Sequence, residues 1–203
     1  MMNKLVVLVF MILGVILGSM GAKTALKVHW LMDGTMNNGW LENMTYGRDD
    51  LSMLKDASNT NMAMGAHLAE HAIYTLGMKD SDGNKLNPDA VYEIVFEGQI
   101  PVVEGGFWSV TSYNGDYPLP LVPNRLNKYS INDGNVQGLS NYTEQGFSFI
   151  YSAEKPEGVA DADWLPASSS NPLPIFRIYR PDTVVLEGNY VMPTIKRINQ
   201  EAL

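Results

Sequence analysis

The chain has 203 residues, of which 45% are hydrophobic and 18% are charged, with 18 glycines and 11 prolines. This composition is typical of one globular domain with many turns, and a chain of this length can fold without a metal ion or a disulfide. The formal net charge of −8 disfavours nucleic acid as a partner, because an acidic surface repels phosphate backbones. The absence of cysteine excludes thiol catalysis, thiolate metal ligands and a lipid-modified cysteine.

The N-terminus is an apolar run, "LVVLVFMILGVILGSM" over 5–20, preceded by Lys4. Small residues at Ser19 and Gly21 predict a secretory signal peptide over 1–21, cleaved after Gly21, and a secreted or periplasmic protein. The alternative is an uncleaved N-terminal helix that anchors the protein in a membrane, because a spanning helix needs only about 20 apolar residues. A membrane is an expected partner only in that second case.

Residues 22–77 are predicted to form a helical segment in front of the main domain. The first part mixes apolar residues with Gly and Asn, which favours short helical turns and loops that pack Trp30 and Trp40 onto a larger body. Between Asn59 and Gly77 the spacing predicts an amphipathic helix. Its core face would hold Met62, Ala66, Ala69, Ile73 and Leu76, and its polar face Met64, His67, His71 and Tyr74.

After residue 77 the pattern changes to short aromatic and β-branched runs between clusters of turn-forming residues. These runs predict strands over 91–96, 107–113, 147–152 and 175–179. Such spacing is typical of a mainly β fold, and residues 78–200 are predicted to form an antiparallel β-sandwich.

The stretch "HLAEH" at 67–71 matches a zinc-hydrolase pattern, with His67 and His71 as ligands and Glu70 as general base. A catalytic zinc needs a third protein ligand, which nothing in the sequence nominates. Two His on the polar face of a helix are more often solvated, so we expect no metal and no cofactor and keep zinc as the alternative. The run "DSDGN" at 80–84 resembles the start of a calcium-binding loop, but Val91 stands where such a loop needs Glu. A β-turn accounts for the Asp and Gly residues of this run without an ion.

A group of aromatic, amide and guanidinium side chains is the best ligand-binding candidate, because flat rings stack on sugars or apolar ligands while polar groups fix orientation. The candidates are Trp108, Tyr113, Asn124, Arg125, Tyr129, Trp164 and Arg177, with Tyr117 and Asn127 beside them. The alternative is that Trp108 and Trp164 belong to the core and that Arg177 is a buried structural ion-pair partner.

Four blocks of the sequence carry a family resemblance: "GFWSVTSYN", "LVPNRLNKYSIND", "DWLPASSSNPLPIFRIYRP" and "LEGNYVMPTIKRI". In this order and spacing, they resemble domain-of-unknown-function family 1214, which usually follows a 1254 domain in exported proteins. The resemblance implies a jelly-roll-like β-sandwich preceded by a helical segment, and no established activity. Arg125, Lys128, Asn132 and Arg180 depart from the family pattern, which puts in doubt any site built on the residues that they replace.

The chain has the 1214 part without the 1254 part, so a homo-oligomer or a partner chain could replace the missing domain. We expect an exported binding or structural module for a carbohydrate, another neutral ligand or a partner protein. The alternative is a hydrolase or lyase that acts on a surface polysaccharide, with catalytic residues that the sequence does not identify. Two glycosylation sequons, at Asn43 and Asn141, matter only in a eukaryotic secretory pathway.

Overall fold

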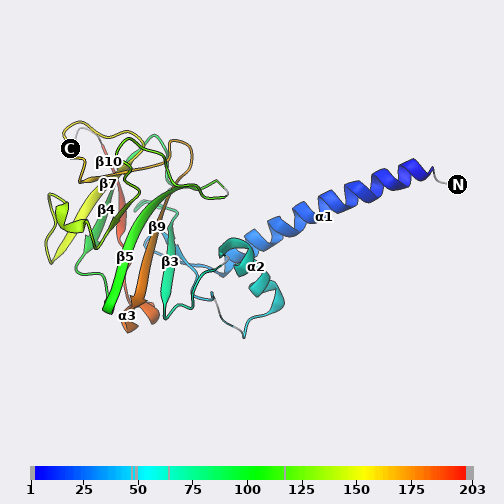
Figure 1. Cartoon of the computed structure of the whole chain (residues 1–203), viewed down its shortest axis with the longest axis horizontal. Coiled ribbons are helices and arrows are strands. Elements are labelled where there is room, and N and C mark those ends of the chain that lie inside the picture. The colour runs from blue at the N-terminus through cyan, green and yellow to red at the C-terminus, as the bar shows by residue number, and fades with distance from the viewer. Residues whose placement is uncertain (1–2, 47, 49, 64, 117, 200–203) are drawn as a thin grey trace.

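The computed structural model describes residues 3–199 except 47, 49, 64 and 117. A two-layer β body carries a long N-terminal helix that projects away from it (Figure 1). The helices are α1 (Lys4–Asp33), α2 (Met53–Ala63) and α3 (Thr183–Leu186), with one 3-10 turn at Val136–Gly138. The strands are β1 (Thr35–Asn37), β2 (Trp40–Glu42), β3 (Ala72–Gly77), β4 (Val91–Glu97), β5 (Val102–Asn114), β6 (Ser130–Asn132), β7 (Gly146–Ser152), β8 (Trp164–Pro166), β9 (Pro172–Pro181) and β10 (Thr194–Ile198).

The strands form a six-stranded sheet in the order β1-β2-β3-β9-β5-β6 and a four-stranded sheet in the order β10-β4-β7-β8. Neighbouring strands are antiparallel except β7 and β8, which are parallel. The predicted mainly β, jelly-roll-like sandwich is confirmed. The strands predicted over 91–96, 107–113, 147–152 and 175–179 are confirmed as β4, β5, β7 and β9.

The core lies between the two sheets, because alternate residues of each strand point inward. Phe96 of β4 stacks on its cross-strand partner Phe147, with ring centroids 4.6 Å apart. It also contacts two rings of the opposite sheet, Trp108 at 5.6 Å and Phe176 at 5.4 Å. Each such ring contributes roughly 2 to 3 kcal/mol through burial, so this aromatic cluster is a main source of the attraction between the sheets.

The prediction of one helix over 60–76 is wrong. Helix α2 ends at Ala63, Gly65 has a φ of +84°, and residues 72–77 form β3. The apolar residues chosen for a helical face include Ile73, which points into the sandwich as part of a strand. A short apolar run fits both periods, and pairing decides for the strand because β3 lies between β2 and β9, which pair its backbone from both sides.

The segment predicted as helical over 22–77 is therefore only partly helical, because β1, β2 and β3 belong to the six-stranded sheet. A tight turn joins β1 to β2, with positive φ at both Asn38 and Gly39, as hairpin turns of this kind require. This hairpin is hydrogen-bonded to the segment between α3 and β10. The Asn38 side chain donates to the Met192 carbonyl at 2.7 Å, and the Trp40 indole donates to the Pro193 carbonyl at 2.7 Å.

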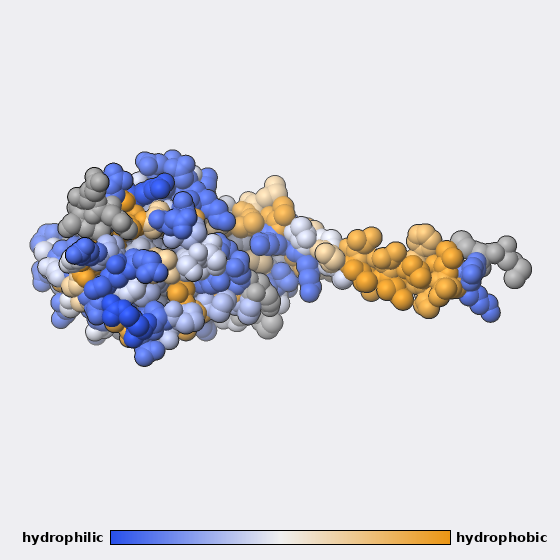
Figure 2. Space-filling model, turned by 90° about the horizontal axis from the view of Figure 1, so that it is seen from above, coloured by the Kyte–Doolittle hydropathy of each residue, from blue (hydrophilic) through white to orange (hydrophobic). Residues whose placement is uncertain are grey.

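Helix α1 has two parts with different surroundings. Its last turns are fixed to the body: Trp30 is buried, Lys55 of α2 lies 3.3 Å from the Asp33 carboxylate, and the Ser58 hydroxyl donates to the Leu26 carbonyl. The apolar residues 5–20 project into open space (Figure 2). Among the described residues, α1 is the helix long and apolar enough to cross a membrane, and a signal sequence has the same properties.

Candidate functional site

The outer face of the six-stranded sheet carries a row of large side chains where β5, β9 and β3 run side by side. Arg177 of β9 lies opposite Tyr74 of β3 and Ser109 of β5, and Tyr179 lies opposite Phe107 of β5. Their neighbours in sequence point into the core, so the strict alternation of the strands places these polar and aromatic residues on one outward face. Part of this face is covered by α1, α2 and the segment between β2 and α2.

A cavity of about 240 Å³ lies between this covered part of the sheet and the helices. The cavity lining is apolar and aromatic, with one guanidinium. Its lining residues are Trp30, Tyr46, Met62, Ala63, Gly65, Ala66, Tyr74, Leu76, Leu119, Ile175 and Arg177. Among the described residues of this lining, Arg177 alone carries a charge.

Five aromatic rings form a continuous series from the cavity to the open part of the sheet. Trp30 and Tyr46 are 6.5 Å apart between centroids, Tyr46 and Tyr74 6.1 Å, and Tyr74 and Tyr179 6.4 Å. The last pair, Tyr179 and Phe107, is stacked at 4.2 Å, and Phe107 is 46% exposed. Burial raises the pKa of the Tyr46 phenol above its ordinary value, so this ring stays neutral inside the site.

Arg177 is held by an aromatic ring and pairs with no carboxylate among the described residues. Its guanidinium donates to the Tyr113 hydroxyl at 3.1 Å and lies 5.2 Å from the centre of the same ring. The alternative of a structural ion pair is therefore not what the structure shows. A half-buried guanidinium without an acidic partner favours an anion, because its positive charge has lost part of its water without a compensating charge.

Trp108 and Trp164 lie in the interior, as their alternative interpretation expected. Trp108 is 6% exposed and stacks on Phe147 at 5.4 Å in the main core. Trp164 is 5% exposed, and its indole donates to the Ser152 carbonyl at 3.1 Å. A ligand could stack on either ring only by opening the packing around it.

The remaining candidates lie away from the cavity. The Asn124 side chain organises its own loop: it donates to the carbonyls of Val122 and Lys128 and accepts two backbone N–H groups. Arg125 is exposed and lies 3.3 Å from the Asp161 carboxylate. Tyr129 is half-buried beside β6. Tyr117 lies outside the described residues.

The "HLAEH" stretch does not have the helical geometry that its zinc interpretation needs, because residues 65–71 form turns and loop. His71 lies 3.7 Å from the Glu70 carboxylate, and both side chains are exposed. Among the described residues, no group of three or more His, Cys, Asp or Glu side chains is arranged to hold a metal ion.

The "DSDGN" stretch is a turn held by one buried carboxylate. The Asp80 Oδ1 atom accepts the backbone N–H groups of Asp82 at 3.1 Å and Asn84 at 2.8 Å, and Gly83 has a φ of +82°. This oxygen is used by the turn itself, which agrees with the β-turn expected there.

Both sequon asparagines have internal hydrogen bonds. Asn43 is buried, and its oxygen accepts from the backbone and the hydroxyl of Thr45. Asn141 donates to the Ser148 hydroxyl at 2.6 Å. A glycan on the Asn141 nitrogen would have to displace its contact to Ser148, and one on Asn43 would have to open the packing that buries this side chain.

Residues 71–183, more than half of the chain, match a family described as "Protein of unknown function (DUF1214)". The chain belongs to the DUF1214 family. This confirms the family resemblance of the four sequence blocks, and it adds no activity.

Two solved structures that resemble this DUF1214 chain are those of longer proteins. The VPA0106 protein from Vibrio parahaemolyticus matches with a TM-score of 0.59 and 28% identity, over 74% of this chain and 36% of that one. A putative uncharacterized protein from Burkholderia cenocepacia matches with a TM-score of 0.47 and 15% identity, over 73% of this chain and 34% of that one. The DUF1214 chain thus spans about a third of each relative's length. No curated protein matches it.

The cavity is shared between the DUF1214 match and the segment that precedes it. Tyr74 and Arg177 belong to the matched residues, whereas Trp30, Tyr46 and Met62 come from α1, the β2–α2 segment and α2. The sequence interpretation identified Tyr113 and Arg177 but missed these three wall residues. Nothing in the local pattern marks them, because only the folded chain brings α1 and α2 onto the outer face of β3.

Proposed function

We propose that this chain is a ligand-binding module, exported or held at a membrane by α1, that binds small amphipathic anions in the cavity between the sheet and the helices. The expected ligands are aromatic or short aliphatic carboxylates. The apolar body would lie among Trp30, Tyr46 and Tyr74, and the carboxylate would pair with Arg177. The observation that carries the proposal is a guanidinium without an acidic partner on an aromatic cavity.

The size and lining of the cavity support a small ligand. Pockets for drug-sized ligands have volumes of roughly 300 to 1,000 Å³, and this cavity has about 240 Å³. A charge-assisted hydrogen bond contributes about 1.5 to 3 kcal/mol, so loss of the guanidinium should weaken binding by a factor of ten or more.

This proposal differs from the neutral ligand expected from sequence. Of the rings considered there for sugar stacking, Trp108 and Trp164 are interior. The rings that line the cavity instead accompany a positive charge, which favours a carboxylate over a neutral sugar.

The test is titration calorimetry on the full chain in lipid nanodiscs, with benzoate and hexanoate as probes and benzyl alcohol and 1-hexanol as neutral counterparts. We expect the carboxylates to bind at least tenfold more tightly than the alcohols. Arg177→Gln should remove this preference, and Arg125→Gln, which changes an exposed arginine outside the cavity, should keep it.

Two further measurements keep the test decisive if Arg177→Gln folds poorly. Thermal unfolding shows whether Arg177→Gln is folded, and Ala66→Phe fills the cavity while it leaves the guanidinium in place. Equal affinity of wild type for benzoate and benzyl alcohol, or full benzoate binding by Ala66→Phe, would exclude the cavity as the anion site.

A further inference from the structure

A second hollow lies at the other side of the C-terminal end of α1, between the β1–β2 hairpin and the segment after α3. Its volume is about 600 Å³. The residues that line it are Asp33, Thr35, Met36, Asn37, Asn38, Glu42, Met44, Thr45, Leu186, Glu187, Gly188, Tyr190 and Val191. None of these lining residues, all of which are described, is a Lys, Arg or His. The hollow is thus acidic and partly apolar.

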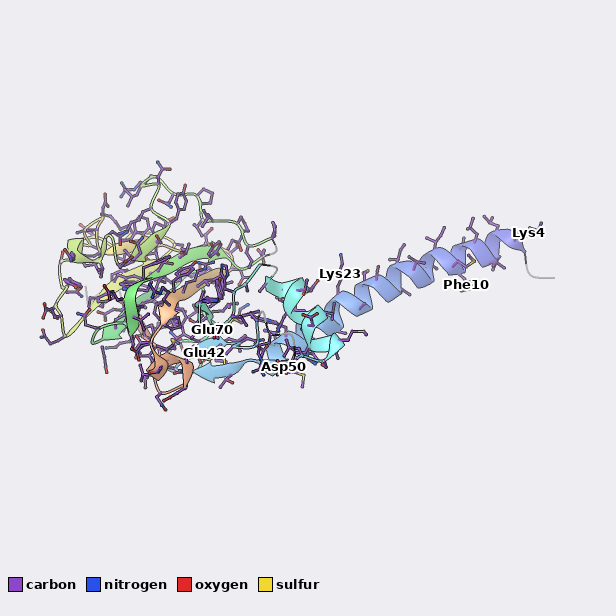
Figure 3. The ribbon with its side chains drawn as sticks, turned by 60° about the horizontal axis from the view of Figure 1, so that its bottom comes forward. Lys4, Phe10, Lys23, Glu42, Asp50 and Glu70 are labelled. Carbon is purple, nitrogen blue, oxygen red and sulfur yellow. The ribbon has the colours of Figure 1, made fainter. Side chains whose placement is uncertain are left out.

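Glu42 is the unusual residue of this hollow. It is 6% exposed, and its Oε1 atom has no hydrogen-bond partner among the described residues. It lies on β2 opposite Thr75 of β3, and Figure 3 shows it beside α3. Burial raises the pKa of Glu42 to about 7, and the nearby Asn37 side chain lowers it by less. The Glu42 side chain is among the residues that line the hollow.

The other ionisable groups around the hollow leave the Glu42 charge uncompensated. Asp33 of α1 already lies 3.3 Å from Lys55 of α2 and 3.6 Å from His29 of its own helix. Glu187, which follows α3, accepts a hydrogen bond from Asn189 at 3.2 Å. Burial raises the pKa of Tyr190 to about 12, so its ring stays neutral. Among the described residues, no Lys, Arg or His lines the hollow to compensate an ionised Glu42.

We propose that this hollow binds an organic ammonium ion, a primary alkyl or aryl amine, with its charged head on Glu42 and its apolar body against Met36, Met44 and Tyr190. An ammonium group has three donors, and the Thr45 hydroxyl and nearby amide oxygens supply acceptors besides the carboxylate. A bare metal ion fits less well because it needs several carboxylate or imidazole ligands, and no group of three is arranged for one among the described residues. This site is separate from the cavity at Arg177.

Calorimetric titration with benzylamine tests the proposal, on the full chain in phosphatidylcholine nanodiscs that offer the amine no anionic lipid. At pH 8 we expect saturable binding of one benzylamine per chain and at least tenfold weaker binding of neutral benzyl alcohol. Glu42→Gln should lose at least tenfold in affinity. Glu157→Gln, which changes an exposed acidic residue outside the hollow, should bind benzylamine as the wild type does.

The pH dependence gives a second criterion. Benzylamine stays protonated from pH 5.5 to 8, whereas Glu42 must be ionised to pair with it, so wild-type affinity should fall about thirtyfold over this range as the ionised fraction decreases. If Glu42→Gln does not fold, the ¹³C signal of the Glu42 carboxyl in the wild type decides. Benzylamine at pH 6.5 should shift this signal toward its ionised position. An unchanged signal, or equal binding of the amine and the alcohol, overturns the proposal.

Discussion

Replacement of Glu42 by Gln should stabilise the protein at high pH and change its stability little at low pH. Burial raises the pKa of this carboxyl from 4.5 to about 7 in the folded chain. The unfolded chain therefore releases the proton first, and unfolding becomes easier as the pH rises from about 4.5 to about 7. Below pH 4.5 the carboxyl is neutral in the folded and the unfolded chain. Above pH 7 it is ionised in both, and the free-energy cost of burying the charge no longer changes with pH. Gln keeps the shape and cannot ionise.

The magnitude follows from the same two values. A tenfold change in an ionisation constant corresponds to about 1.4 kcal/mol. The unfolding free energy of Glu42→Gln minus that of the wild type should therefore rise by about 2 to 3 kcal/mol between pH 5 and pH 8, as an upper bound.

Urea unfolding followed by tryptophan fluorescence measures this difference at both pH values. Glu157→Gln measures the effect of removing one surface charge and is subtracted. A difference between Glu42→Gln and wild type that is the same at pH 5 and pH 8, or larger at pH 5, would refute the assigned environment of Glu42.

Two substitutions test the fold itself. Gly39→Ala should lower the free energy of unfolding by about 2 kcal/mol or more, because Gly39 has a φ of +86° and a Cβ there would lie 2.3 Å from the Lys79 carbonyl oxygen. Gly138→Ala, with no atom within 4 Å of the added Cβ, is the matched control, and equal denaturation midpoints for the two variants would contradict the hairpin geometry. Trp108→Ala should cost about 3 to 5 kcal/mol, measured by urea unfolding, because its ring fills the core. A loss of carboxylate binding in folded Trp108→Ala, without a loss of stability, would show that this ring contacts ligand instead.

The strands of the sandwich could be predicted because their signals are local. In β4, β7 and β9, β-branched and aromatic residues alternate or cluster between Gly, Pro, Asn and Asp, and those features need no knowledge of the partner strand. The segment at 72–77 could not be assigned in the same way. Its apolar residues fit a helix as well as a strand, and its partner β9 lies about a hundred residues later in the chain.

Of the residues that line the cavity, the sequence identified Arg177 as a ligand-binding candidate, together with Tyr113, which contacts it. Arg177 and Tyr113 stand in family blocks rich in polar and aromatic residues, and their chemistry suggested a ligand. Trp108 and Trp164 are aromatic residues of the same blocks and also suggested a ligand, but they lie in the interior. A ring on a strand can point to either face of the sheet, and the sequence alone does not show which face. Trp30 and Glu42 had no local signal, since their importance depends on which surfaces α1 and β2 meet after folding.

The contact between the β1–β2 hairpin and the segment after α3 has a consequence for how the protein is made. The hairpin at Asn38 and Trp40 hydrogen-bonds to backbone at Met192 and Pro193, about 155 residues later, and β10 then closes the edge of the second sheet. A ribosome therefore releases the first strands long before their anchoring segment exists. The hairpin cannot make these hydrogen bonds until residue 193 has left the ribosome, so this part of the fold is completed late in synthesis.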